Sequence, residues 1–209
     1  MNNVYFGGKK IIPGLLALLL SCSVFGQGTS WTNPDADFSK YSKFLVKPLD
    51  IADVKVLKPA WEQDNPEEWE FAPDAGAAIQ ALYREAITEA LSADDGYAVV
   101  SEEGDDVLQL EVEFLSITPY MKPGSTAKSK GFVIETLGSG DVVVSAELRD
   151  SVTGSVLALV EGERTIGADY KELSRENHVA NLRETFSAWG KRLRARMDGW
   201  RAIEEWEAQ

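Results

Sequence analysis

The strongest constraint on the fold is the alternation of apolar and polar residues over residues 107–118, VLQLEVEFLSIT. Successive side chains of an extended strand point to opposite faces. The apolar face carries Leu108, Leu110, Val112 and Phe114, and the polar face carries Gln109, Glu111 and Glu113. One face of this strand is therefore packed and the other is hydrated, which predicts an antiparallel or mixed sheet covered on one side only.

Two helices are expected to cover that side. Over Asp74–Leu91 the apolar residues recur with the i, i+3, i+4, i+7 spacing of one helix face. A longer helix is predicted from about Ser174 to Glu205. Its apolar stripe consists of Leu182, Phe186, Trp189, Leu193, Met197, Trp200 and Ile203. We expect this second helix to lie on the sheet beside the first, with Trp189 near the centre of the contact.

The remaining strands are short. They are predicted near 43–47, 53–57 and 97–101, and as a hairpin over 141–150 and 155–166. Gly154 lies in the hairpin turn, where a positive φ is needed. Few helices and meandering strands predict the α+β class, with a single mixed or antiparallel sheet and two main helices packed on one face. We assign residues 41–205 to this one domain, a length that supports a single core.

The first residues are typical of an export signal. Lys9 and Lys10 precede an apolar run from Ile11 to Leu20, which is about half the length of a membrane-spanning helix. Residues 1–21 are therefore predicted to form a signal peptide. The polar, aperiodic residues 22–40 that follow are interpreted as a flexible tether.

Two cleavage sites compete in this leader. Leu19-Leu20-Ser21-Cys22 is similar to a lipobox, in which the cysteine thiol receives a diacylglyceryl group and cleavage makes that cysteine the first residue. We favour lipidation of Cys22. Because Ser23 rather than aspartate follows, we expect attachment to the outer membrane, facing the periplasm. The alternative is ordinary cleavage after Gly26, which would give a soluble periplasmic or secreted protein.

The charge of the chain excludes some partners. It carries 34 acidic and 21 basic residues, and two of the basic residues lie in the leader. A nucleic-acid binder needs a basic surface, so we expect no nucleic-acid partner. An acidic surface is also repelled by anionic lipid headgroups, so membrane attachment is expected through the lipid anchor. The expected partners are other proteins of the envelope.

The sequence offers little catalytic or metal-binding chemistry. His178 is the only histidine and Cys22 the only cysteine, so a zinc site lacks ligands. No Gly-x-Ser-x-Gly motif accompanies His178. Glu111 and Glu113 share a strand face, as paired catalytic carboxylates would, but alternation predicts hydrated glutamates there whatever the function. We predict no catalytic residue, no cofactor and no metal.

One loop is a candidate interaction surface. Trp61, Trp69 and Phe71 alternate with carboxylates in a proline-bearing loop, and aromatic residues on loops are common interface anchors. The alternative is that these aromatic residues fold back onto the core. The favoured function is a non-enzymatic interaction or assembly module. The other two hypotheses are a periplasmic hydrolase that uses His178 or carboxylates, and a small-ligand-binding protein with the 120–131 loop as a lid.

Several segments resemble a known bacterial family. They are YSKFLVKPL, DDVLQLEVEFLSITP, AELRDSVTGSVLALV and FSAWGKRLRARMD. They are similar to the domain-of-unknown-function family 3313 (DUF3313), over about residues 38–200. The most specific parts are RDSVTGSVL and the run Trp189–Asp198, in which Gly190 departs from the usual alanine. The resemblance implies an exported envelope protein of shared fold, and it carries over no functional residue.

Overall fold

The computed structural model describes residues 28–71, 74–123 and 134–207. The predicted signal peptide and Cys22 lie outside these residues. The strands are β1 (Gly28–Thr32), β2 (Lys43–Val46), β3 (Lys55–Val56), β4 (Ala98–Val100), β5 (Val107–Pro119), β6 (Glu135–Leu137), β7 (Gly140–Asp150), β8 (Val156–Thr165) and β9 (Tyr170–Glu172). The helices are α1 (Ala75–Ser92) and α2 (Arg175–Glu207), with short 3-10 helices η1 (Ala60–Glu62) and η2 (Ala93–Asp95).

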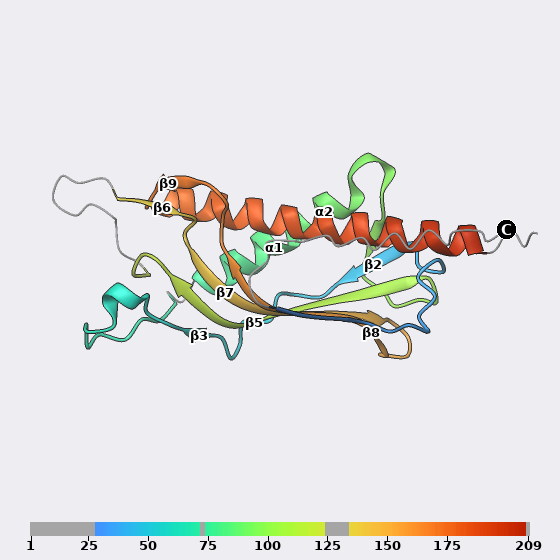
Figure 1. Cartoon of the computed structure of the whole chain (residues 1–209), viewed down its shortest axis with the longest axis horizontal. Coiled ribbons are helices and arrows are strands. Elements are labelled where there is room, and N and C mark those ends of the chain that lie inside the picture. The colour runs from blue at the N-terminus through green and yellow to red at the C-terminus, as the bar shows by residue number, and fades with distance from the viewer. Residues whose placement is uncertain (1–27, 72–73, 124–133, 208–209) are drawn as a thin grey trace, which may run out of the picture.

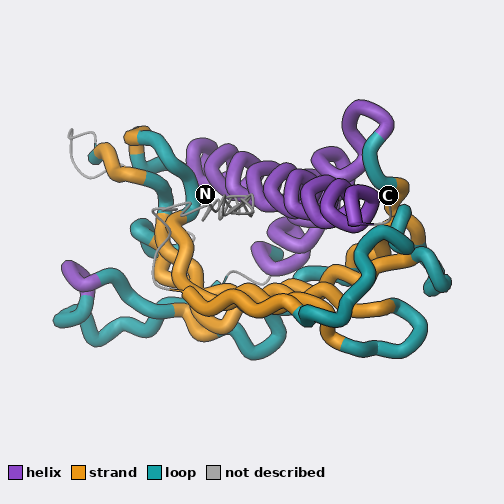
Figure 2. Tube along the Cα trace, turned by 45° about the vertical axis from the view of Figure 1, so that its right-hand side comes forward, coloured by secondary structure: helices purple, strands orange, loops and turns teal. Residues whose placement is uncertain are grey.

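The main sheet has the strand order β1-β8-β7-β5-β2-β4, and β3 pairs with the far end of β5. The pairs β1–β8, β8–β7 and β7–β5 are antiparallel, whereas β2 runs parallel to both β4 and β5. Strands β6 and β9 form a small second sheet that the sequence analysis did not predict. Both helices lie on one side of the main sheet (Figures 1 and 2). This arrangement confirms the predicted α+β class, with a mixed sheet and two helices on one face.

Strand β5 supplies the centre of the core, as its alternation predicts. Its apolar face is buried, and Phe114 lies opposite Val144 of β7 in the register. The register then shifts between Phe114 and Ser116, so that Leu115 is an extra residue in a β-bulge. The bulge returns Ile117 to the buried face, where it is 1% exposed. An uninterrupted strand would have turned Ile117 toward water, because the side-chain period is two.

Helix α2 packs on this face through Phe186. The Phe186 ring is fully buried and contacts the rings of Tyr83 on α1, Phe114 on β5 and Trp189, with centroid distances of 5.4, 6.2 and 5.5 Å. Trp189 is half-buried beside it. The predicted position of α2 is therefore observed, but Phe186 rather than Trp189 lies at the centre of the contact.

The prediction that residues 28–40 form part of a flexible tether is wrong. Residues 28–32 form β1, which pairs with β8 along its whole length. Beyond β1, Phe38 is buried and stacks on Trp200 of α2 at 4.0 Å, and Tyr41 is 1% exposed. The sequence GTSWT of β1 has no apolar alternation because it is an edge strand held by backbone hydrogen bonds.

Among the described residues, no helix is both long and apolar enough to cross a membrane.

The two helices approach each other closely at Gly190. A Cβ atom on Gly190 would lie 2.7 Å from the Cβ atom of Ala90 and 3.5 Å from the Cα atom of Ile87, both on α1. Carbon atoms in a packed interior do not approach to 2.7 Å, so any larger residue would force the helices apart. Gly199, also on α2, has no neighbour within 4 Å of such an added Cβ.

These two glycines give a matched test of the helix contact. Gly190→Ala should destabilise the domain by about 1–3 kcal/mol, because the cost of overpacking exceeds the roughly 1 kcal/mol gain in helix propensity. Gly199→Ala should instead stabilise it by up to about 1 kcal/mol. Urea denaturation measures both. The double variant Gly190→Ala with Ala90→Gly should recover part of the stability lost in Gly190→Ala. Equal changes in stability for Gly190→Ala and Gly199→Ala would contradict the close helix contact.

Candidate functional site

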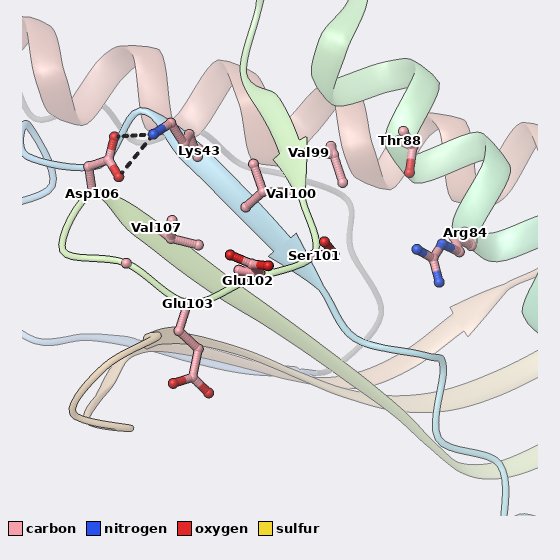
Figure 3. Close-up of a pocket in the computed structure, with 11 residues that line it drawn as sticks. Lys43, Arg84, Thr88, Val99, Val100, Ser101, Glu102, Glu103, Asp106 and Val107 are labelled. Carbon is pink, nitrogen blue, oxygen red and sulfur yellow. Dashed lines mark hydrogen bonds and ion pairs between the residues drawn. The ribbon is translucent and has the colours of Figure 1, made fainter.

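One hollow of about 640 Å³ lies at the edge of the sheet beside β4. Arg84 and Thr88 face it from α1, and the ion pair of Lys43 and Asp106 lies on its other side (Figure 3). The Lys43 Nζ atom is 3.0 Å from Asp106 Oδ2. A hydrogen bond from the Ser42 hydroxyl, together with Lys43, lowers the pKa of Asp106. The hollow therefore combines the outer edge of β4 with acidic and basic side chains, of which Lys43 and Asp106 form an ion pair.

One face of the sheet carries no helix, and we call it the open face (Figure 2). A second hollow of about 500 Å³ is lined by residues of this face and, from α1, by Gln80. Here Arg149 lies between two carboxylates on neighbouring strands. Its Nε atom is 3.0 Å from Glu111 Oε2, and it also forms an ion pair with Glu147. The side-chain amide of Gln109 donates to Glu111 Oε1 at 2.7 Å. Glu111 is thus engaged by Arg149 and Gln109, an arrangement that serves cross-strand pairing.

His178 lies near the start of α2 and is half-buried. Burial lowers its pKa, so the imidazole is neutral at pH 7. Within the described residues its ring forms no hydrogen bond with a serine or a carboxylate, and no group of three or more His, Cys, Asp or Glu side chains could hold a metal ion. The geometry of a Ser-His-Asp relay is therefore not assembled from the described part of the chain.

The predicted aromatic surface is only partly exposed. Trp61 on η1 is 62% exposed and lies against the Tyr120 ring at 5.4 Å. Trp69 is buried, at 6% exposure, and Phe71 packs against the core. The three side chains therefore form no common surface, because Trp69 and Phe71 fold back as the alternative hypothesis stated. Residues 124–131 of the proposed lid lie outside the described residues.

The most specific family motif, RDSVTGSVL, forms the turn between β7 and β8 around Asp150. One carboxylate oxygen accepts hydrogen bonds from the Tyr41 hydroxyl at 2.7 Å and from Lys40 Nζ at 3.0 Å. The other accepts from the backbone N–H of Thr153 at 2.8 Å and from its hydroxyl at 3.0 Å. Gly154 has φ +70°, the positive value predicted for this turn. Asp150 thus ties the hairpin turn to the segment that precedes β2.

The same motif also fixes the loop before β5. The Ser151 hydroxyl donates to the carbonyl oxygen of Gly104 at 3.0 Å and accepts from the Gly104 N–H at 3.1 Å. Both Asp150 and Ser151 are buried. Sequence analysis missed this polar cluster, although the order Asp-Ser-Val-Thr-Gly is typical of a turn in which aspartate bonds the following backbone. The buried residues Asp150 and Ser151 serve the fold and line neither hollow, whereas Arg149, the first residue of the motif, lines the second hollow through its ion pairs.

The hydrogen bonds around Asp150 shift the pKa values of its own carboxyl and of the groups that bind it. Burial would by itself raise the pKa of the carboxyl, but the hydrogen bonds from Thr153, Tyr41 and Lys40 hold it well below its ordinary value. Burial and the bond to Asp150 raise the pKa of Tyr41 to about 12. The ionised carboxylate is therefore stabilised in the folded state relative to the unfolded chain.

Asp150→Asn is expected to lower stability by about 2 kcal/mol at pH 7, because hydrogen bonds to a charged group are lost. The contribution of a carboxylate with a lowered pKa is present above its unfolded pKa of about 4, and it is lost as the pH falls further. The gap in unfolding free energy between wild type and variant should therefore narrow below about pH 4. Asp35→Asn, at an exposed carboxylate, is the control and should change little. A gap that stays constant on acidification would contradict this role.

A comparison with known protein families identifies the same family as the sequence motifs do. The family described as "Protein of unknown function (DUF3313)" matches residues 21–193, which confirms the resemblance identified from the sequence. A comparison with curated proteins found no significant match.

The similar solved structures are distant in sequence. PelC from Paraburkholderia phytofirmans, a dodecamer, has 13% identity and a TM-score of 0.38, covering 81% of this chain and 98% of that one. XCC0632 from Xanthomonas campestris has 12% identity and a TM-score of 0.41, covering 78% and 86%. A predicted lipoprotein from Caulobacter crescentus CB15 has 9% identity and a TM-score of 0.36, covering 73% and 92%. Matches this distant carry no argument about function.

Proposed function

The chain belongs to the DUF3313 family of proteins of unknown function, and from that premise we propose that it is a non-enzymatic interaction module of the bacterial envelope. In this proposal the acylated Cys22 holds the domain at the periplasmic face of the outer membrane. The partners are envelope proteins, and the domain meets them through its surface rather than through a catalytic pocket.

The observation that carries the proposal is the position of the family motif. Its buried polar residues Asp150 and Ser151 close a turn and brace a loop, whereas the polar residues of an enzyme family's motifs commonly converge on a pocket. In the second hollow, Glu111 and Glu147 are already engaged in ion pairs with Arg149. The motif therefore supports a protein in which a stable scaffold, rather than reactive chemistry, is the common property of the family.

The sheet also offers surfaces for association. In the described part of the chain, β1 and β4 each pair with one strand only, so each has one edge with unpaired backbone groups. Such edges are a common route by which an extended segment of another protein joins a sheet. Trp61, at 62% exposure, supplies an exposed aromatic side chain on η1. These features support an interaction role.

The test of the anchor is the fate of Cys22. An acylated amino terminus carries three fatty chains, and each buried CH₂ group contributes about 0.8 kcal/mol. The wild-type protein should therefore stay with membranes through high-salt washing and partition into detergent. Cys22→Ala should either remain uncleaved or, after cleavage behind Gly26, become soluble. Mass spectrometry that finds an unmodified Gln27 amino terminus on the wild-type protein would refute the lipid anchor.

The interaction role is tested separately by crosslinking and affinity purification from native envelopes. A stable stoichiometric protein partner is the expected result. His178→Ala should leave the phenotype of the cell unchanged, and a loss of function in this variant at normal protein levels would favour the hydrolase hypothesis instead.

A further inference from the structure

Strand β1 fixes the start of the folded domain close to the predicted anchor. It pairs with β8 from Gly28↔Gly162 to Thr32↔Ala158, and the N–H of Asn33 donates to the Leu157 carbonyl at 2.8 Å. From Gly28 onward the chain is therefore held to the sheet. Only residues 23–27 separate Cys22 from β1.

This short connection limits how far the domain can move from the bilayer. At about 3.3–3.6 Å per residue, Gly28 can lie at most about 20 Å from the Cα atom of Cys22. Helix α2 has 33 residues and is about 50 Å long at 1.5 Å per residue. The domain is therefore much longer than its connection, and the anchor favours contact between the membrane and the part of the sheet that begins at β1.

The side chains of β1 suit a lipid surface. Gly28–Thr32 carries no charged residue, and Trp31 is 46% exposed. Tryptophan is enriched at membrane interfaces because its ring is apolar while its N–H can bond to headgroups or water. Within the described residues no strand pairs with the outer edge of β1, so its backbone groups are available to the same polar layer.

Charge sets the orientation about this edge. The register places several acidic residues on the open face, namely Glu111, Glu113, Glu147, Glu161 and Glu163. Anionic headgroups repel such a surface. The register also places Trp31, opposite Leu159 of β8, on the open face, so its side chain stands at the rim of that face. The sheet therefore meets the membrane by its β1 edge rather than by its open face, and the glutamates on β8, β7 and β5 lie farther from the headgroups than Trp31 does.

We propose that the free edge of β1, with Trp31, is the membrane-facing surface of this protein, and that its partner is the headgroup layer of the bilayer. This inference rests on the proposed acylation of Cys22. It differs from the proposed function in naming which edge is turned to lipid. In this orientation the opposite edge of the sheet, at β4, faces the periplasm.

Two serines provide a matched test. Ser30 lies on β1 and Ser101 directly after β4 at the opposite edge of the sheet, and both are exposed. Because the acylated Cys22 has no free thiol, Ser30→Cys and Ser101→Cys each provide the single thiol for a spin label. The full chain, purified with its acyl groups confirmed by intact mass, is placed in vesicles of phosphatidylethanolamine and phosphatidylglycerol that contain a lipid with a Ni²⁺-chelating headgroup.

The expected result is a several-fold larger enhancement of spin relaxation at position 30 than at position 101. Inserting a flexible Gly/Ser segment of about 20 residues after Gly26 adds about 25 Å of mean reach and should largely remove this difference. With the native connection, Trp31→Ser should reduce the enhancement at position 30, whereas Trp61→Ser, at another tryptophan that is exposed in the described part of the chain, should not.

The outcomes that overturn the inference are distinct. Equal enhancement at the two positions on a protein with confirmed acyl groups would overturn the orientation and leave the lipid anchor intact. Dipolar broadening between labels at position 30 would show that β1 pairs with a second copy instead of facing lipid, and would also overturn it. An unmodified amino terminus would refute the anchor, and this inference with it.

Discussion

The structure depends on the burial of one face of β5 under helix α2. Phe114 on the strand and Phe186 on the helix are both buried, and Tyr83 of α1 closes on the Phe186 ring from the side. Because α2 has to lie on that face, α1 can pack beside it only at the distance that Gly190 permits. The bulge at Leu115 shifts the register of β5, so that apolar side chains on both sides of the bulge point to the face that the helices cover.

This one-sided core determines where interactions can occur. The helices cover one face of the sheet, and the open face carries glutamates whose charges Arg149 balances only in part. In the part of the chain that the structure describes, the main sheet ends at two outer strands, and each has an edge that pairs with no further strand. β1 lies close to the predicted lipid anchor and β4 lies at the opposite edge. In the orientation that we propose, the order of the strands separates the membrane edge at β1 from the edge at β4, which is left for protein partners. The Asp150 turn ties the β7–β8 hairpin of this scaffold to Tyr41.

Much of the fold could be predicted because, in its main elements, the spacing of the apolar residues in the sequence matches the residues that are buried in the structure. The alternation of β5 and the stripe of α2 each repeat over several turns or residue pairs, so single exceptions do not hide them. The strand β1 and the small β6–β9 sheet could not be found in this way, because short edge strands are held by backbone bonds and need no apolar pattern. The candidate site was harder still. Trp61 and Trp69 look alike in the sequence, yet one is exposed and the other is buried.

The sequence by itself determined the α+β class, the faces of β5 and α2 that are buried, and the presence of a single histidine and a single cysteine, and it predicts an export signal with Cys22. These properties are local or compositional, so neighbouring residues suffice to define them. The tertiary structure alone decided that Phe186 is the centre of the core, that Asp150 binds Tyr41 across the chain, and that the chain is fixed to the sheet from Gly28. Each of these depends on residues far apart in the sequence, and only the packing of helices on the sheet brings them together.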